Sequence, residues 1–195
     1  MLTKRILDYA SRHPVFRVED IARVLRINRV RVSKILYYME RRGAVKRVMK
    51  GIYTITSDDR VVATGIYRPS YISMFTALYL HGILLQVPSR IQVVTTKVYG
   101  VKKVIFNGTE IIYYKISPRY FFEYIWKMNK YTYFLATPEK AIIDTVYYGM
   151  SPDIGQMDIE QIDLNKLKQI VKIYPKTLQT KIRRLITRLR KLKPI

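Results

Sequence analysis

Cationic and hydrogen-bonding side chains gather on one face of a helix that the sequence predicts over residues 29–42. At 100° per residue, the apolar residues of this stretch fall on one side and form its buried face: Val32, Ile35, Leu36 and Met39. The opposite face carries Lys34, Tyr37, Tyr38 and Arg41, with Arg31 and Ser33 at its edges. Arginine can bond both acceptors of a guanine, and hydroxyl groups reach bases or phosphates. The pattern favours a duplex-DNA contact over a face that is merely solvated, with a protein–protein contact as the other alternative.

The elements around this helix predict a winged helix-turn-helix. Short helices are expected over 2–10 and 18–26, and Asn28 is a good N-cap for the helix at 29–42, which Gly43 ends. Strands are expected over 45–48 and 52–55. This hairpin, the 45–55 wing, would bring Arg47 and Lys50 to backbone phosphates or a minor groove.

The composition points to a polyanionic partner. Among 195 residues, 36 are Lys or Arg and 14 are Asp or Glu, a net charge of +22. The chain has no cysteine and two histidines, which excludes disulfides and cysteine-based metal sites, and neither a metal nor a cofactor is expected. We expect a cytoplasmic protein without a signal peptide.

The fold class expected is α+β, with three segments. Residues 1–57 form the winged helix, 58–150 a mixed α+β domain that starts with a connector at 57–60, and 151–195 a basic helical segment. In the second segment we expect a helix from a Ser70 cap to Gly82, strands over 90–97, 102–106, 110–116 and 131–136, and a helix over 138–148. The uncharged run 69–89 predicts a helix plus a loop, not a membrane span.

The second segment resembles the AbiEi family, the antitoxins of type IV toxin–antitoxin systems and related regulators. The matching positions are Tyr71, Ile72, Ser73, Ala77, Leu78, His81, Gly82, Ala136, Pro138, Glu139, Lys140, Ala141 and Asp144, and with the winged helix the resemblance covers residues 1–150. It implies a repressor of its own operon that binds inverted repeats, through basic residues mapping here onto Arg29, Arg31, Lys34, Arg41 and the wing. It also implies that the second domain counters a toxin resembling a nucleotidyltransferase.

The shared polar residues have a modest physical interpretation. Lys140 and Asp144 are spaced i,i+4 on a helix, which predicts a surface ion pair, with a small-molecule or partner contact as the alternative. His81 precedes a helix-ending glycine and is expected to pack or cap.

The last segment predicts two amphipathic helices, over 163–173 and 176–192. From Leu164 onward there are eleven basic residues and no acidic one. A leucine-type stripe is usually core, so docking onto the domain is the first expectation and homodimerisation the second; phosphate contact by the basic side is compatible with both.

No catalytic constellation or phosphate-binding loop is present in the sequence, so an enzyme is not expected. The first hypothesis is a DNA-binding transcriptional regulator acting on an inverted-repeat operator, which requires a homodimer. The alternatives are an antitoxin that mainly neutralises a toxin protein, and an RNA-binding protein.

Overall fold

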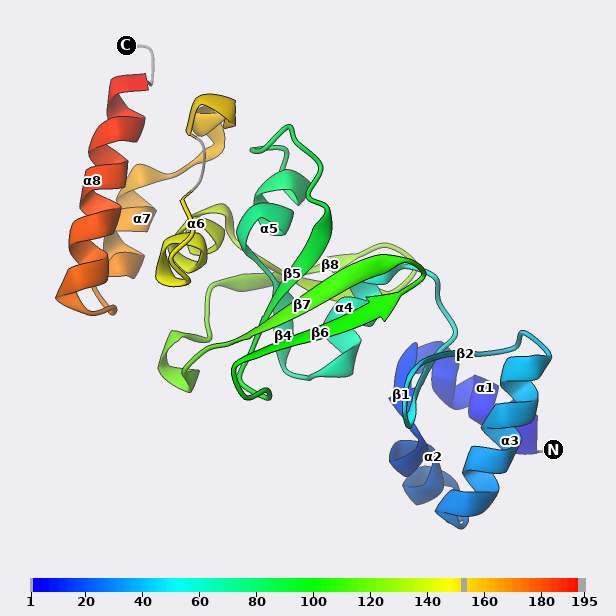
Figure 1. Ribbon diagram of the computed structural model, residues 1–195. Coiled ribbons are helices and arrows are strands. Elements are labelled where there is room, and N and C mark those ends of the chain that lie inside the picture. Colours follow the sequence, from blue (N-terminus) through cyan, green and yellow to red (C-terminus); the bar gives the residue numbers. More distant parts are fainter. Residues whose placement is uncertain (1, 152–153, 193–195) are drawn as a thin grey trace.

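The N-terminal part is a three-helix unit with a small sheet. The computed structural model describes residues 2–151 and 154–192. Its first elements are α1 (Leu2–Arg12), β1 (Val15–Arg17), α2 (Val18–Leu25), α3 (Arg29–Arg41), β2 (Lys46–Met49) and β3 (Ile52–Thr54) (Figure 1). The strands form an antiparallel sheet in the order β1-β3-β2. The three expected helices and the hairpin are present, and they enclose a core that includes Ile6, Phe16, Ile21 and Leu36.

Strand β1 was not expected from the sequence. It has three residues directly after Pro14 and pairs with β3, Val15 lying opposite Thr54. Three residues are too few to show the alternation that identifies a strand.

The expected connector at 57–60 is shorter than predicted, because a helix begins at Asp59. Asp58 is the N-cap of helix α4 (Asp59–Ile66), and its carboxylate accepts hydrogen bonds from the backbone and the guanidinium of Arg60. The helix packs against β1, where the Arg17 guanidinium donates to the carbonyl of Ile66 at 2.6 Å. Helix α4 thus connects the two parts of the molecule.

The second part is built on a six-stranded mixed sheet in the order β6-β7-β5-β4-β9-β8. Its strands are β4 (Ser70–Ile72), β5 (Arg90–Thr95), β6 (Val101–Phe106), β7 (Thr109–Lys115), β8 (Tyr124–Met128) and β9 (Thr132–Ala136). The pairs β5–β7 and β4–β9 are parallel and the others antiparallel. Asn107 and Gly108 both have positive φ in the β6–β7 turn, which confirms the expected hairpin.

The expected helix over 70–82 is shorter than the sequence suggested. Ser70 lies in β4, which pairs with β5, and helix α5 (Met74–Leu80) starts after Ser73. Ser70 is therefore not the cap of this helix. Gly82 closes the helix with φ of +73°, as expected.

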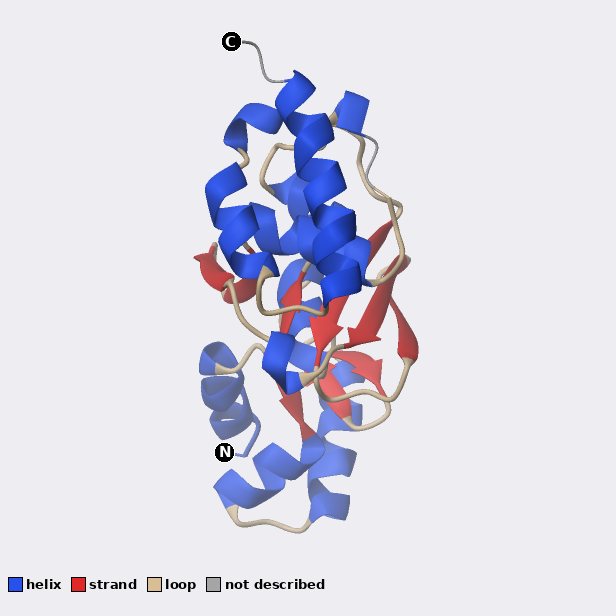
Figure 2. Cartoon of the chain, turned by 90° about the vertical axis from the view of Figure 1, so that its left-hand side faces the viewer, coloured by secondary structure: helices blue, strands red, loops and turns tan. Residues whose placement is uncertain are grey.

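Helices cover the sheet and bring the C-terminal segment into the core. Helix α6 (Pro138–Tyr147) is followed by α7 (Leu164–Val171) and α8 (Lys176–Leu192), with single 3-10 turns at Pro118–Tyr120, Ile154–Gln156 and Ile159–Gln161. These C-terminal helices lie at the end of the molecule opposite the N-terminal unit (Figure 2). The apolar stripe of α8 is buried against α6 and α7, which confirms the docking expectation: Leu178, Ile182, Leu185, Ile186 and Leu189.

The membrane question has a direct structural answer. Among the described residues, no helix is long and apolar enough to cross a bilayer.

Candidate nucleic-acid interface and a buried polar cluster

Helix α3 is held with one face in the core and the other outside. Asn28 caps it, its side chain accepting a hydrogen bond from the amide of Val30 at 2.7 Å. Val32 and Leu36 are fully buried and Met39 nearly so, while Ile35 is half-buried against the same core. The expected inner face of this helix is confirmed, so the opposite face points away from the core.

The outer face of α3 is cationic and aromatic. Arg31, Lys34 and Arg41 are exposed, and within the part of the chain that the structure describes none of them lies in an ion pair. Tyr37 and Tyr38 are 52% and 61% exposed, and the Arg41 guanidinium lies 5.9 Å from the Tyr37 ring centroid. We refer to these five residues as the α3 outer face.

Two other expected DNA-binding residues are placed differently. Arg29 forms an ion pair with Glu19 of α2 at 2.6 Å, so its charge is partly neutralised. Ser33 is half-buried at the edge of the helix. Neither belongs to the free cationic surface.

The β2–β3 hairpin presents a second cationic element. Lys50 is exposed in its turn, beside Gly51 with φ of +77°, and Arg47 is exposed on β2. The wing therefore keeps both of its expected cations in solvent.

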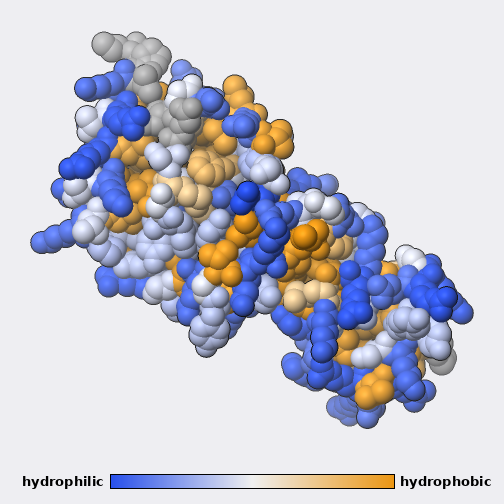
Figure 3. Space-filling model, viewed as in Figure 1, coloured by the Kyte–Doolittle hydropathy of each residue, from blue (hydrophilic) through white to orange (hydrophobic). Residues whose placement is uncertain are grey.

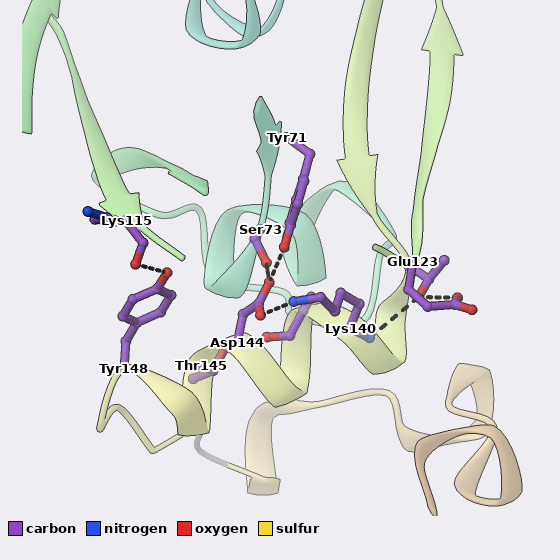
Figure 4. A network of polar contacts seen from close by, with 10 residues as sticks. Tyr71, Ser73, Lys115, Glu123, Lys140, Asp144, Thr145 and Tyr148 are labelled. Atoms are coloured by element: carbon purple, nitrogen blue, oxygen red, sulfur yellow. Dashed lines mark hydrogen bonds and ion pairs between the residues drawn. The ribbon is translucent and has the colours of Figure 1, made fainter. Parts of the chain in front are cut away.

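Four of the family-motif residues of the second domain, Tyr71, Ser73, Lys140 and Asp144, meet in one buried cluster, which Figure 4 shows. Asp144 on α6 accepts hydrogen bonds from the Tyr71 hydroxyl at 3.1 Å and the Ser73 hydroxyl at 2.7 Å, and it pairs with Lys140. Tyr71 is in β4 and Ser73 begins α5, so Asp144 ties the sheet to two helices. Because Ser73 donates to Asp144, its side chain does not cap α5.

The prediction of a surface ion pair is wrong: Lys140 and Asp144 both have 0% exposed side chains. The ammonium group of Lys140 lies 5.4 Å from the Tyr71 ring centroid, 5.6 Å from Phe122 and 5.9 Å from Tyr174. Charged pairs at this spacing usually face water, but here the sheet and the α7–α8 connection cover both sides of α6. Rings that face a cation stabilise it most when water is excluded.

Burial sets the protonation behaviour of this cluster. Burial lowers the pKa of Lys140, and the neighbouring Asp144 carboxylate acts against that change. Burial and the same carboxylate raise the pKa of Tyr71 well above its usual value. Tyr71 therefore stays a hydrogen-bond donor to Asp144.

The remaining motif residues support α6 from outside this cluster. Thr137 caps the helix, Pro138 is its first residue, and buried Glu139 accepts a hydrogen bond from the amide of Asp163 at 3.0 Å. His81 caps α5 and bonds through Nε2 to the carbonyl of Ala136 at 2.8 Å, and burial lowers the pKa of its ring. The expectation that His81 packs or caps is confirmed.

No signal in the sequence indicates that Phe122 and Tyr174 belong to the cluster. They lie in irregular segments with no periodic pattern, 18 residues before and 34 residues after Lys140. Within the described residues, no group of three or more histidine, cysteine, aspartate or glutamate side chains could hold a metal ion.

The N-terminal unit is similar to a known protein family. Residues 4–56 match the family model described as "Transcriptional regulator, AbiEi antitoxin", which confirms the suspected resemblance for these residues. The match covers the N-terminal unit and not the segment with the buried cluster. No curated protein matches the chain.

Proposed function

We propose, from the match of residues 4–56 to a family of AbiEi antitoxins and transcriptional regulators, that this chain is a regulator that binds duplex DNA. The observation that carries the proposal is the α3 outer face. It is exposed, cationic and unpaired within the described residues, and it lies inside the matched segment. The second helix of a helix-turn-helix is the element that enters the major groove.

The chemistry assigns a different task to each part of this surface. Arg31 and Lys34 lie in the N-terminal half of α3, from which side chains reach base edges. Tyr37, Tyr38 and Arg41 lie further along and would contact phosphates, and Arg47 and Lys50 of the wing would do the same. Repression of its own operon through an inverted repeat needs two copies of the chain. Each copy binds one half-site of the DNA, and the half-sites are about one helical turn apart.

The family description also favours a second candidate function, that of an antitoxin. In this alternative the second domain contacts a toxin protein, and DNA binding serves regulation only.

The α3 outer face can be tested by removing its two N-terminal cations. We expect Arg31→Ala and Lys34→Ala each to weaken operator binding by about 5- to 150-fold, equivalent to about 1–3 kcal/mol. Arg31→Ala should also reduce the preference for operator over scrambled duplex if Arg31 reads a base. The measurement is fluorescence anisotropy with DNA from upstream of the gene and a scrambled duplex, at several salt concentrations.

Lys102→Ala is the matched control, because Lys102 is exposed on β6, outside the winged helix. It removes one positive charge and should leave the operator preference unchanged. Wild-type affinity in both α3 variants would refute the assignment of α3. Stronger binding of structured RNA than of either duplex would instead support an RNA-binding protein.

A further inference from the structure

A second cationic surface lies on α7 and α8. Of the eleven basic residues after position 163, Lys166 is paired with Glu123 and Glu139, and Lys193 lies outside the described residues. The other nine are exposed or half-exposed, and in the described ranges none of them forms an ion pair. Hydrophilic side chains project along the outer edge of this end of the molecule, with apolar patches between them (Figure 3). A surface that holds so many uncompensated cations requires an anionic partner or a cloud of counterions.

The cations of α8 form two rows along the helix. Arg183 and Arg190 are seven residues apart, about 10 Å along the axis, and they line a groove of about 320 Å³ with Lys168 of α7 and Lys172, which directly follows α7. On the other flank, Lys181, Arg184 and Arg188 line a hollow of about 280 Å³ beside the end of α6. We call these seven residues the α8 basic face.

The residues around the α8 basic face favour one class of anionic partner over others. The apolar stripe of α8 is buried, so this helix has no free apolar face to insert into a lipid surface. Among residues 164–191 no aromatic side chain is exposed, so stacking with the bases of a single strand has no platform here. Rows of guanidinium and ammonium groups without aromatic partners suit the phosphate backbone of a duplex.

The two cationic surfaces lie at opposite ends of the chain. Helix α3 is on the outer side of the N-terminal unit and α8 is on the outer side of the other end (Figures 1 and 2). A duplex seated on α3 therefore lies at the end of the molecule away from the α8 basic face.

We propose that the α8 basic face binds the backbone of a second duplex DNA segment, so that one chain bridges two duplexes. This inference rests on the proposed function, because α3 supplies the first contact. The α8 contact is independent of sequence, since its cations meet phosphates rather than base edges.

Bridging can be measured by capture between two DNA duplexes. An operator duplex is fixed to beads and a fluorescent scrambled duplex is added with the full chain, wild type or variant. We expect wild type to retain the fluorescent duplex and Arg183→Gln/Arg190→Gln to lose most of the retention while keeping operator affinity within about twofold. The Arg31→Ala/Lys34→Ala variant still binds duplex DNA weakly. Adding Arg183→Gln/Arg190→Gln to it should lower the number of counterions released on binding, measured from the salt dependence of the affinity, by about two.

The matched control is Lys97→Gln/Lys102→Gln, which removes the same charge from exposed positions outside both surfaces and should retain bridging. Wild-type retention in the Arg183→Gln/Arg190→Gln variant would overturn the proposal, since bridging would then come from two copies joined through other surfaces. Absence of bridging by wild type, or capture of duplex RNA but not of duplex DNA, would also overturn it. Failure of the proposed function can be told apart from failure of bridging, because in that case Arg31→Ala and Lys34→Ala keep the operator affinity of the wild type.

Discussion

Replacing Asp144 with asparagine is expected to lower the free energy of unfolding by about 3–5 kcal/mol, because it leaves the ammonium group of Lys140 buried without its counter-ion. The free energy lost by leaving the Lys140 charge unpaired cannot exceed the free energy needed to deprotonate Lys140. A lysine with the ordinary pKa of about 10.4 can be deprotonated at pH 7 for about 4.6 kcal/mol. Urea unfolding at pH 7, followed by circular dichroism, measures the change.

A double substitution shows how much of the loss comes from the unpaired charge and how much from altered packing. Lys140→Met/Asp144→Asn removes both charges and keeps an oxygen that can accept from Tyr71 and Ser73, so it should recover much of the loss. Arg29→Met is the comparison, because the side chains of its ion pair with Glu19 are 67% and 41% exposed and the pair should contribute at most about 1 kcal/mol. Equal destabilisation by Asp144→Asn and Arg29→Met would contradict the buried-charge interpretation.

The same variant has a predicted pH dependence. The folded-state pKa of Lys140 lies below the unfolded value, so between the two values the unfolded chain binds more protons and stability rises with pH. Loss of the Asp144 carboxylate lowers the Lys140 pKa further, which moves the start of this rise to lower pH. Between pH 7 and 9, Asp144→Asn should gain stability by at most about 1.4 kcal/mol per pH unit relative to Lys140→Met/Asp144→Asn.

The N-terminal unit could be predicted from local signals alone. The ends of α3 are marked by Asn28 and Gly43. The i, i+3, i+4 spacing of its apolar residues Val32, Ile35 and Leu36 predicts its buried face, without reference to the rest of the chain. The same holds for the Asn107–Gly108 hairpin and for the amphipathic helix α8. In each case the determining contacts lie within a few residues or one periodic stripe.

The errors arose where distant pairing determines the structure. Ser70–Ile72 became a strand because β5 and β9 lie on either side of it, and β8 exists because β9 pairs with it at the sheet edge. The burial of Lys140 depends on Tyr71 and Tyr174, which are 69 and 34 residues away along the chain. A spacing rule for helices can pair Lys140 with Asp144, but it carries no information about what covers them.

Gly65 offers a test of how the two parts of the molecule are joined. Within a helix, glycine to alanine usually stabilises by up to about 1 kcal/mol, and Gly65 is the second-last residue of α4. At Gly65 in α4, however, an added Cβ would lie 2.5 Å from Cβ and 2.6 Å from Cγ2 of Val15 in β1. Because these distances are far below van der Waals contact, we expect Gly65→Ala to reverse the usual sign and to lower the free energy of unfolding by about 1–3 kcal/mol.

The partner of Gly65 shows whether this steric contact is the cause. Val15→Ala removes both Cγ atoms, two of the three atoms near the added Cβ, so Val15→Ala/Gly65→Ala should lose less stability than the sum of the single variants. Additive losses in urea unfolding, or a more stable Gly65→Ala, would show that β1 and α4 do not meet this closely. Non-additive losses would mean that the winged helix is seated directly on α4, so a displacement of the second domain at this contact would move α3.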